Sequence, residues 1–269
     1  MNTINSSTSA HRATFWGRGA NSFLSVDKKF AFTLAEILIT LGIIGVVAAM
    51  TIPNLIVAKE QRVTLTRLKK TYSDLAQAIR LAEADYGAGF SMCDFDVCRH
   101  EREKSKAAFN KYIRPYMKVS KEYSDTECNN LYKVYTKSGL VYQPNSTACY
   151  QLLNGTAIAF SIGIQDSYEL QTYAIGFVIF PNPHRPRQLV GQDAFTFNYI
   201  DEGNGYYVGT AVRQRGNLTR AELISACAAA ENKIQITLGG QLIPVQSACT
   251  ELIIRDGWKF AKDYPIKFH

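Results

Sequence analysis

The stretch KKFAFTLAEILITLGIIGVVAAMTIPNLI, residues Lys28–Ile56, decides how this chain is organised. Its apolar run from Phe32 to Ile52 holds 21 residues. At the α-helical rise such a run spans about 31 Å, which matches a bilayer core of roughly 30 Å. Lys28 and Lys29 come immediately before the run, and the positive-inside rule keeps such residues in the cytoplasm. We therefore predict one membrane-spanning helix, with its N-terminus inside and everything after Pro53 outside.

One carboxylate, Glu36, lies inside this apolar run and close to its start. An ionised side chain in a spanning helix costs about 2.5–3.5 kcal/mol at the helix centre and less near the end. Two interpretations follow from this cost. Glu36 either reaches the membrane surface from its position near the helix end, or it pairs with a group outside the lipid.

The residues around Glu36 resemble the class III signal of type IV prepilins and type II secretion pseudopilins. That signal is a small residue, then Phe-Thr-Leu-x-Glu and a long apolar run, and this chain has AFTLAE before such a run and Pro53. The resemblance covers residues 28 to about 87, with Ala31 where Gly is usual. It implies that a membrane-embedded prepilin peptidase cuts between Ala31 and Phe32 and N-methylates the new Phe terminus.

Counted from that cut, Glu36 is the fifth residue and Pro53 the twenty-second, as in the family. The resemblance implies that Glu36 pairs with the N-terminal ammonium of a neighbouring subunit as it enters a helical filament. The cut at Phe32 then creates the cation that the buried carboxylate needs. By the same resemblance, the helix is expected to loosen on assembly near Pro53, Gly42 and Gly45, which are weak helix points.

An ordinary secretory signal is the alternative for this segment. Val47-Ala48-Ala49 offers a small-x-small cleavage site, and cleavage there would release a soluble, secreted binding protein that begins at Met50. An uncleaved signal would leave a membrane-anchored binding protein or enzyme. The glutamate inside the apolar region and the unbroken helical pattern beyond it favour the prepilin interpretation.

The chain is predicted to have four parts. Residues 1–31 form a leader, residues 32–52 the membrane-spanning half of a long helix, residues 53–88 its amphipathic half, and residues 89–269 an extracytoplasmic globular head. The amphipathic half is indicated by apolar residues at spacings of three and four. These are Leu65, Leu68, Tyr72, Leu75, Ile79 and Ala82. The glycines of YGAG, residues 86–89, are expected to end the helix.

The head is predicted to be α+β, with an antiparallel sheet packed on the long helix, which is the pilin architecture. Its predicted strands are rich in Val, Ile, Tyr, Phe and Thr and lie in LYKVYTKSGLVYQ, CYQLLNGTAIAFSIGI, YAIGFVIF, FTFNYI and YYVGTAVR. DEGNG, residues 201–205, predicts a hairpin turn. Two helices are expected in LTRAELISACAAA, with Thr219 as cap before Glu222, and in VQSACTELIIRDGW.

The chain has six cysteines, all after the apolar run, as an oxidising compartment would permit. Six cysteines allow 15 pairings, so the sequence does not decide the connectivity. The favoured arrangement pairs Cys227 with Cys249, Cys128 with Cys149 to close the first strand pair, and Cys93 with Cys98. Metal binding is disfavoured because the chain has no Cys-x-x-Cys and its four histidines are scattered.

No enzyme signature and no cofactor motif occurs in the sequence. Gly191, Asp193 and Phe195 match the end of a loop that can hold calcium in many pilin-like proteins. The preceding residues, FPNPHRPR, place His184, Arg185 and Arg187 where a cation would need acids, so a structural loop is favoured over calcium. These basic residues could instead meet an anion, DNA included, although a solvated turn is the commoner outcome.

Together these features predict a non-enzymatic structural subunit of a type IV pilus-like filament or of a type II secretion pseudopilus. The expected partners are other copies or related subunits, prepilin peptidase, an inner-membrane assembly platform and the lipid bilayer. Of the net charge of +7, residues 1–31 carry +3, and the remaining charge of about +4 is too mild to argue for DNA. The expected location is the inner membrane, as a single-pass protein with its head outside, and then an extracellular or periplasmic filament.

Overall fold

A computed structural model describes residues 33–87, 92, 102–139, 141–142, 147–167, 170–201, 206–210, 218–233, 235–238 and 241–268. It divides the chain into two compact units, residues 1–50 and 51–269. The predicted leader, the predicted cleavage residues Ala31 and Phe32, and the predicted Cys93–Cys98 pair lie outside the described residues.

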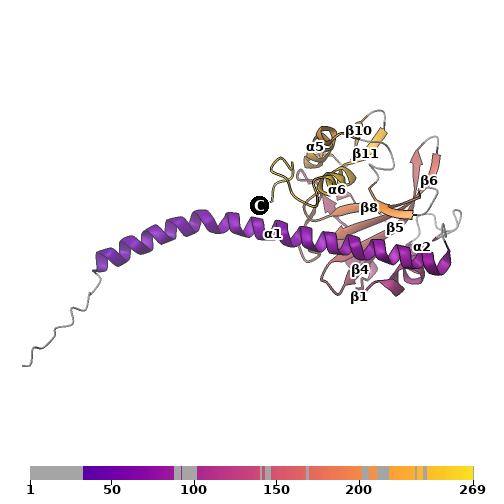
Figure 1. Cartoon of the computed structure of the whole chain (residues 1–269), viewed down its shortest axis with the longest axis horizontal. Coiled ribbons are helices and arrows are strands. Elements are labelled where there is room, and N and C mark those ends of the chain that lie inside the picture. The colour runs from indigo at the N-terminus through magenta and orange to yellow at the C-terminus, as the bar shows by residue number, and fades with distance from the viewer. Residues whose placement is uncertain are drawn as a thin grey trace, which may run out of the picture. The chain divides into compact units, whose positions relative to one another are not determined.

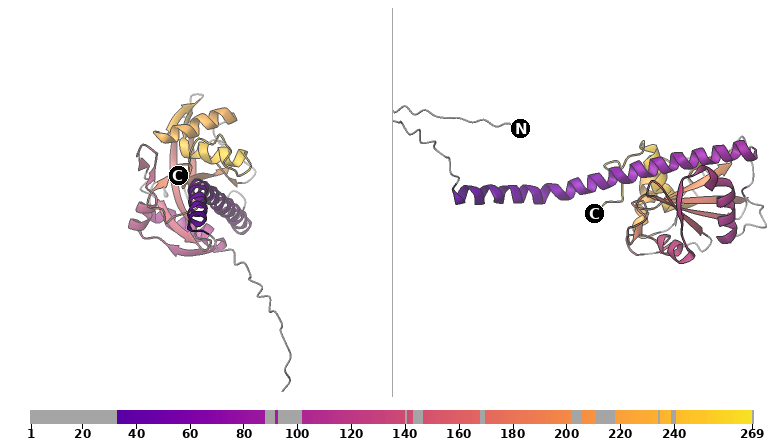
Figure 2. Two further views of the ribbon diagram at one scale, coloured as in Figure 1. Left: turned by 90° about the vertical axis from the view of Figure 1, so that its left-hand side faces the viewer. Right: turned by 90° about the horizontal axis from the view of Figure 1, so that it is seen from below.

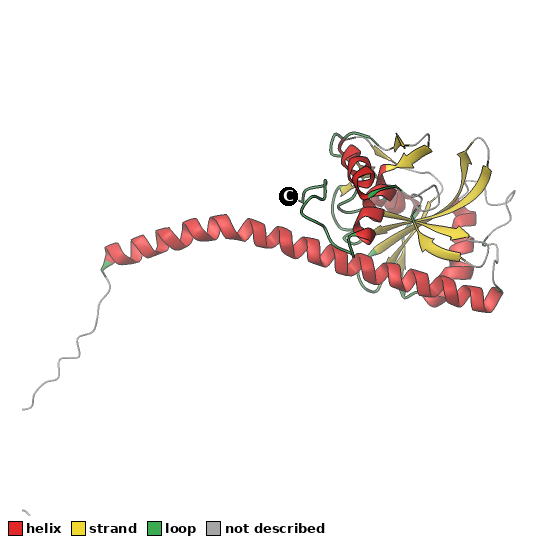
Figure 3. Ribbon diagram, turned by 45° about the horizontal axis from the view of Figure 1, so that its top comes forward, coloured by secondary structure: helices red, strands yellow, loops and turns green. Residues whose placement is uncertain are grey.

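The chain begins its described part with one 53-residue helix, α1 (Leu34–Tyr86), drawn as a continuous coil in Figures 1 and 3. Pro53 lies inside the helix, where it leaves the carbonyl four residues earlier without its helical donor. The helix ends where the sequence predicted, because Gly87 has a φ of +95° and its N–H bonds to the Glu83 carbonyl at 2.9 Å.

The part of α1 from residue 51 onward belongs to the second unit and packs on it through one face. Leu68, Leu75, Ile79 and Ala82 of the predicted stripe are buried, and Leu65 and Tyr72 pack at its edge. Thr71 and Ala78 complete this face. The helical period of 3.6 residues therefore places the predicted apolar positions against the core, which confirms that part of the pattern.

The head is built around a six-stranded sheet in the order β1-β4-β5-β6-β8-β9, and every pair in it is antiparallel. Figures 1 and 2 show this sheet lying alongside the outer part of α1. The strands are β1 (Val119–Glu122), β4 (Thr147–Leu152), β5 (Ala157–Ser167), β6 (Leu170–Phe180), β8 (Phe195–Asp201) and β9 (Tyr206–Gly209). The protein is therefore α+β, as predicted.

The predicted strand in LYKVYTKSGLVYQ is only partly correct. This segment forms two short strands, β2 (Val134–Tyr135) and β3 (Val141–Tyr142), in a separate three-stranded sheet. Their third partner is β7 (Gln188–Leu189), which runs parallel to β2. The predicted hairpin joins β8 and β9, although residues 202–205 of its turn lie outside the described part.

Short helices flank the sheet. The two predicted near the C-terminus are α5 (Arg220–Ala228), with the 3₁₀ turn Ala229–Glu231 after it, and α6 (Val245–Arg255). Thr219 and Glu222 form the predicted capping box of α5. Helix α2 (Arg102–Ala108) was not predicted; it continues into a π turn and a 3₁₀ turn through Tyr116. Helix α3 (Asp125–Leu131) and the hairpin of β10 (Gln235–Leu238) and β11 (Gln241–Pro244) were not predicted either.

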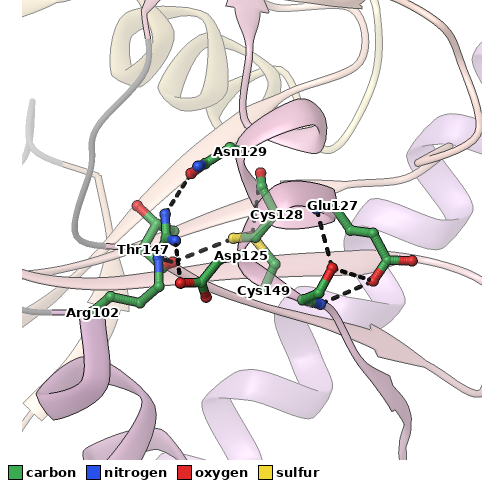
Figure 4. Close-up of a disulfide and its surroundings, with 8 residues drawn as sticks. Arg102, Asp125, Glu127, Cys128, Asn129, Thr147 and Cys149 are labelled. Atoms are coloured by element: carbon green, nitrogen blue, oxygen red, sulfur yellow. Dashed lines mark hydrogen bonds and ion pairs between the residues drawn. A yellow bond between two sulfur atoms is a disulfide. The ribbon is translucent and has the colours of Figure 1, made fainter.

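Two disulfides join Cys128 to Cys149 and Cys227 to Cys249, which are the two favoured pairings in the described part. The first was expected to close a strand pair, and that detail is wrong. Figure 4 shows that it ties helix α3 to strand β4, since Cys128 lies on the helix. Arg102 reinforces the junction by donating to the Thr147 carbonyl at 2.8 Å and pairing with Asp125 at 3.0 Å.

Candidate assembly site

The first half of α1, residues 34–58, carries apolar side chains on all sides, and we call it the stem half. Its large aliphatic side chains from Leu34 to Ile56 are between 44% and 75% exposed. The core helix of a water-soluble domain would bury such residues, whereas this helix is long and apolar enough to cross a membrane. The stem half therefore needs lipid or another apolar surface around it.

Glu36 is the one charged residue of the stem half, and the next charge along the chain is Lys59. The 22 residues between them span about 33 Å as a helix, close to the thickness of a bilayer core. In this arrangement Glu36 marks one end of an uncharged rod and Lys59 marks the other.

The structure gives Glu36 a local role that the sequence analysis missed. Glu36 Oε2 accepts hydrogen bonds from the backbone N–H and the hydroxyl of Thr33, both at 2.8 Å. The Thr33 hydroxyl oxygen in turn accepts from the Glu36 N–H at 3.2 Å. This reciprocal pair is a capping box, and the pattern Thr-x-x-Glu before an apolar run is the sequence signal that would have found it.

The capping box fixes the carboxylate at the start of α1 without neutralising it. Both donors from Thr33 are uncharged, so the box supplies no cation to pair with the carboxylate. The positive end of the helix dipole also stabilises a carboxylate at this position. The geometry therefore holds an anion where the predicted cut before Phe32 would create an N-terminal cation.

The loop from Pro181 to Phe195 lies where a calcium-binding loop was considered. Arg185 contacts Glu60 of α1 at 2.8 Å and Asp193 at 3.3 Å. Burial raises the pKa of Asp193 to about 6, against the opposing attraction of Arg185 and a hydrogen bond from the Leu189 N–H. The arginine thus holds the position beside Asp193 that a metal would take, and the described residues contain no group of three metal-ligating side chains.

The remaining residues of the calcium pattern serve the fold. Gly191 adopts a φ of +72°, and a Cβ there would meet Cys249 Sγ and the Tyr264 hydroxyl at 3.0 Å each. Tyr264 donates to the Gly191 carbonyl at 2.6 Å. The glycine is therefore required by its backbone conformation and by close packing.

Two of the three basic side chains of this loop are engaged within the head. Arg185 forms the ion pairs described above, while Arg187 stacks on the Tyr135 ring at 4.8 Å and donates to the Thr136 carbonyl. His184 is exposed. The arrangement ties the loop to α1 and to β2, and the charge of Arg185 is paired with Glu60 and Asp193.

A cavity of about 40 Å³ lies beside β2, between Tyr135, Leu189 and Ala230. This space holds a few water molecules, and sites for organic ligands enclose roughly 300–1,000 Å³. We take the stem half of α1 and its carboxylate as the candidate functional site.

The fold and the site define a class: an α+β head on a long helix whose first half is exposed, apolar and able to span a membrane. The chain belongs to the family of unknown function DUF6613, whose model matches residues 54–268. The match begins directly after Pro53, so it covers the head half of α1 and the head but not the signal-like segment. No curated protein and no solved structure matches the chain.

Proposed function

We propose that this chain is a structural subunit of a type IV pilus-like filament or of a type II secretion pseudopilus. The observation that carries the proposal is Glu36, held by a capping box at the start of an exposed apolar rod and five residues after the predicted cut. The prepilin-like signal around it supplies the processing step, in which prepilin peptidase cuts between Ala31 and Phe32.

Assembly is the proposed mechanism. Before assembly the stem half lies in the inner membrane with the head outside, as the preceding lysines predict. An assembly platform then lifts the subunit, and its stem packs among the stems of neighbours. Lipid tails are as apolar as these side chains, so moving the stem from lipid into the array brings little hydrophobic gain of its own. The array instead keeps the aliphatic side chains out of water by packing them against one another.

The carboxylate of Glu36 gives this packing its register. Within an apolar array an unpaired carboxylate is costly, and the ammonium of Phe32 on a neighbouring subunit removes that cost only when the two stems are correctly offset. Thr33 keeps the carboxylate at the helix start through neutral hydrogen bonds, which leaves its charge for the ammonium. The pair therefore fixes the axial offset between neighbouring stems as well as joining them.

The head supports the proposal through its arrangement. The one-sided burial of α1 on an antiparallel sheet is what a pilin-like subunit needs, because the sheet covers one face of the helix and leaves the rest for neighbours. The secretory alternative requires a cut after Ala49, which lies in the middle of α1, with helix on both sides. No feature of the described head favours that alternative.

The test separates the charge of Glu36 from its capping role. Mass spectrometry of the mature protein is expected to find Phe32, N-methylated, as the first residue. Glu36→Gln keeps a hydrogen-bonding group for the capping box and removes the charge, so we expect normal processing but at least about a tenfold loss of filament.

Thr33→Ala is the matched control, because it removes the capping hydroxyl and keeps the charge. We expect it to form filaments at close to the normal yield. Equal filament yields from Glu36→Gln and the unmodified chain would overturn the charge-pairing mechanism, and a mature N-terminus at Met50 would overturn the proposed function itself.

A further inference from the structure

We infer that the head half of α1 (residues 59–86) carries a basic stripe, and that the membrane-proximal end of this stripe binds anionic phospholipid headgroups at the outer surface of the membrane. The stripe consists of Lys59, Arg62, Lys69 and Arg80. This inference rests on the proposed membrane insertion of the stem half and adds a lipid preference to it.

The stripe lies on one face of the helix. At 100° per residue its four cations fall within an arc of about 80°, and all four are exposed. The buried face, centred on Leu68 and Leu75, lies on the opposite side. Among the described residues, no carboxylate lies within ion-pair distance of these four side chains.

Two acids of α1 near the stripe already have other partners, one in the head and one on α1 itself. Glu60 pairs with Arg185 at 2.8 Å, and Asp74 pairs with Lys70 at 2.5 Å. Glu60 lies on the head-facing side of α1, so its pairing leaves Lys59 and Arg62 without local compensation. The membrane-proximal end of the head half therefore presents an uncompensated positive charge.

The position of this charge selects the partner. Lys59 is the first charge after the 22 uncharged residues that follow Glu36, a length of about 33 Å. When the uncharged rod fills the bilayer core of roughly 30 Å, Lys59 and Arg62 lie at the level of the outer headgroups. Anionic headgroups at that level attract each nearby Lys or Arg, which strengthens lipid retention about fivefold per residue.

The same geometry predicts a gradient along the stripe. Lys69 lies about 15 Å and Arg80 about 31 Å farther along the helix than Lys59. Electrostatic attraction to the membrane surface falls off over about 8–10 Å at physiological salt. Lys59 and Arg62 are therefore the lipid-binding residues. Arg80 has the same charge and lies on the same face, but it is too far from the membrane surface to be attracted to the headgroups.

The test uses the processed full chain in detergent micelles with an equimolar mixture of phosphatidylcholine and phosphatidylglycerol. Native mass spectrometry counts the lipids retained per chain at low and high salt. The unmodified chain is expected to retain phosphatidylglycerol in preference to phosphatidylcholine, and the preference falls as salt rises. The double variant Lys59→Gln with Arg62→Gln is expected to lose it, by roughly twentyfold or more in relative retention.

Arg80→Gln is the matched control and is expected to keep the full preference, with Lys69→Gln between the two. Equal retention by the double variant and by Arg80→Gln would overturn the inference. Chemical cross-linking between copies is measured on the same variants. A double variant that keeps its lipids but loses these cross-links would also overturn the inference, because the partner of Lys59 and Arg62 would then be a second copy of the chain.

Resistance to alkaline extraction from membranes is measured on every variant. Extraction of the unmodified chain would contradict the proposed membrane insertion. An unmodified chain that resists extraction but shows no lipid preference would contradict only the lipid binding by the basic stripe.

Discussion

The two halves of α1 are one continuous helix with opposite relationships to their surroundings. In the stem half, every large aliphatic side chain from Leu34 to Ile56 is exposed. In the head half, Leu68, Leu75 and Ile79 are at most 1% exposed and form part of the core. The same kind of residue is thus used twice, once to fold the head and, in the proposed function, once to meet lipid or other subunits.

The difference shows that the spacing of apolar residues along a helix decides what the helix can pack against. A stripe with a spacing of three and four residues buries one face against a sheet, while an all-round apolar segment has no preferred face and suits a uniform apolar medium. The boundary lies at residues 58–60, where charged residues reappear after the uncharged rod and Glu60 is joined to Arg185 of the head.

The largest expected effect separates the two halves directly. Leu75→Ala removes a fully buried side chain and is expected to lower the free energy of unfolding of the head by about 2–5 kcal/mol. Leu41→Ala shortens a side chain that is 60% exposed, and we expect no change in the stability of the head. Urea denaturation in detergent micelles, followed by the emission of Trp258 in the processed chain, measures both. Similar losses of head stability in the two variants would contradict the division of α1 into a stem half and a head half.

The next effect concerns the disulfide that joins helices α5 and α6 of the head. Replacing Cys227 and Cys249 together by Ser opens a loop with a sequence separation of 22 between helices α5 and α6. The loss is expected to be about 3 kcal/mol on the chain-entropy model. The same urea series detects it, and the stem half should keep its resistance to alkaline extraction.

A pH effect of smaller size tests the link between α1 and the loop that follows β6. Asp193 has a pKa of about 6, above its ordinary value of 3.8, so the folded head binds this proton more tightly than the unfolded chain does. Its contribution to stability is therefore present below about pH 4 and lost as the pH rises to about 6, with a limit of about 3 kcal/mol.

Asp193→Asn is expected to flatten this part of the pH profile, which urea midpoints between pH 4 and pH 7 measure. The groups that face Asp193 are Arg185 and, through it, Glu60. A variant whose profile still falls with the original slope would show that another group titrates there.

The smallest effect compares two capping boxes with the same chemistry. Thr219→Ala removes the cap of α5, which packs on the head, and is expected to cost about 1 kcal/mol of head stability. Thr33→Ala removes the corresponding cap of α1, which begins outside the head unit, and should leave the urea midpoint of the head unchanged. A shift in both midpoints would mean that the start of α1 is coupled to the folding of the head.

Local patterns account for the features that were predicted correctly. The stripe through Leu68 and Leu75, the stop at Gly87 and the cap at Thr219 each depend on a few neighbouring residues. The Thr33–Glu36 box was equally local and was missed because the charge of Glu36 was considered without the hydroxyl three residues before it. Cysteines in helical patterns near the C-terminus likewise suggested the Cys227–Cys249 pair.

The other missed features either depend on partners distant in the sequence or lie in elements too short to give a pattern. Strand β2 pairs in parallel with β7 over only two residues, and β7 lies about fifty residues later in the chain. Cys128 was assigned to a strand because its helix, α3, is only seven residues long and too short for a periodic signal. Arg185 was considered as an anion contact, and only the folded chain shows it between Glu60 and Asp193.

The sequence by itself determined the apolar rod, the single carboxylate near its start and the one-sided helix that follows, because each is written in the order of neighbouring residues. The tertiary structure alone decided the order of the strands, the short sheet beside them and the ion pairs of Arg185. These depend on which distant segments meet in the core, and short-range pattern carries no information about that.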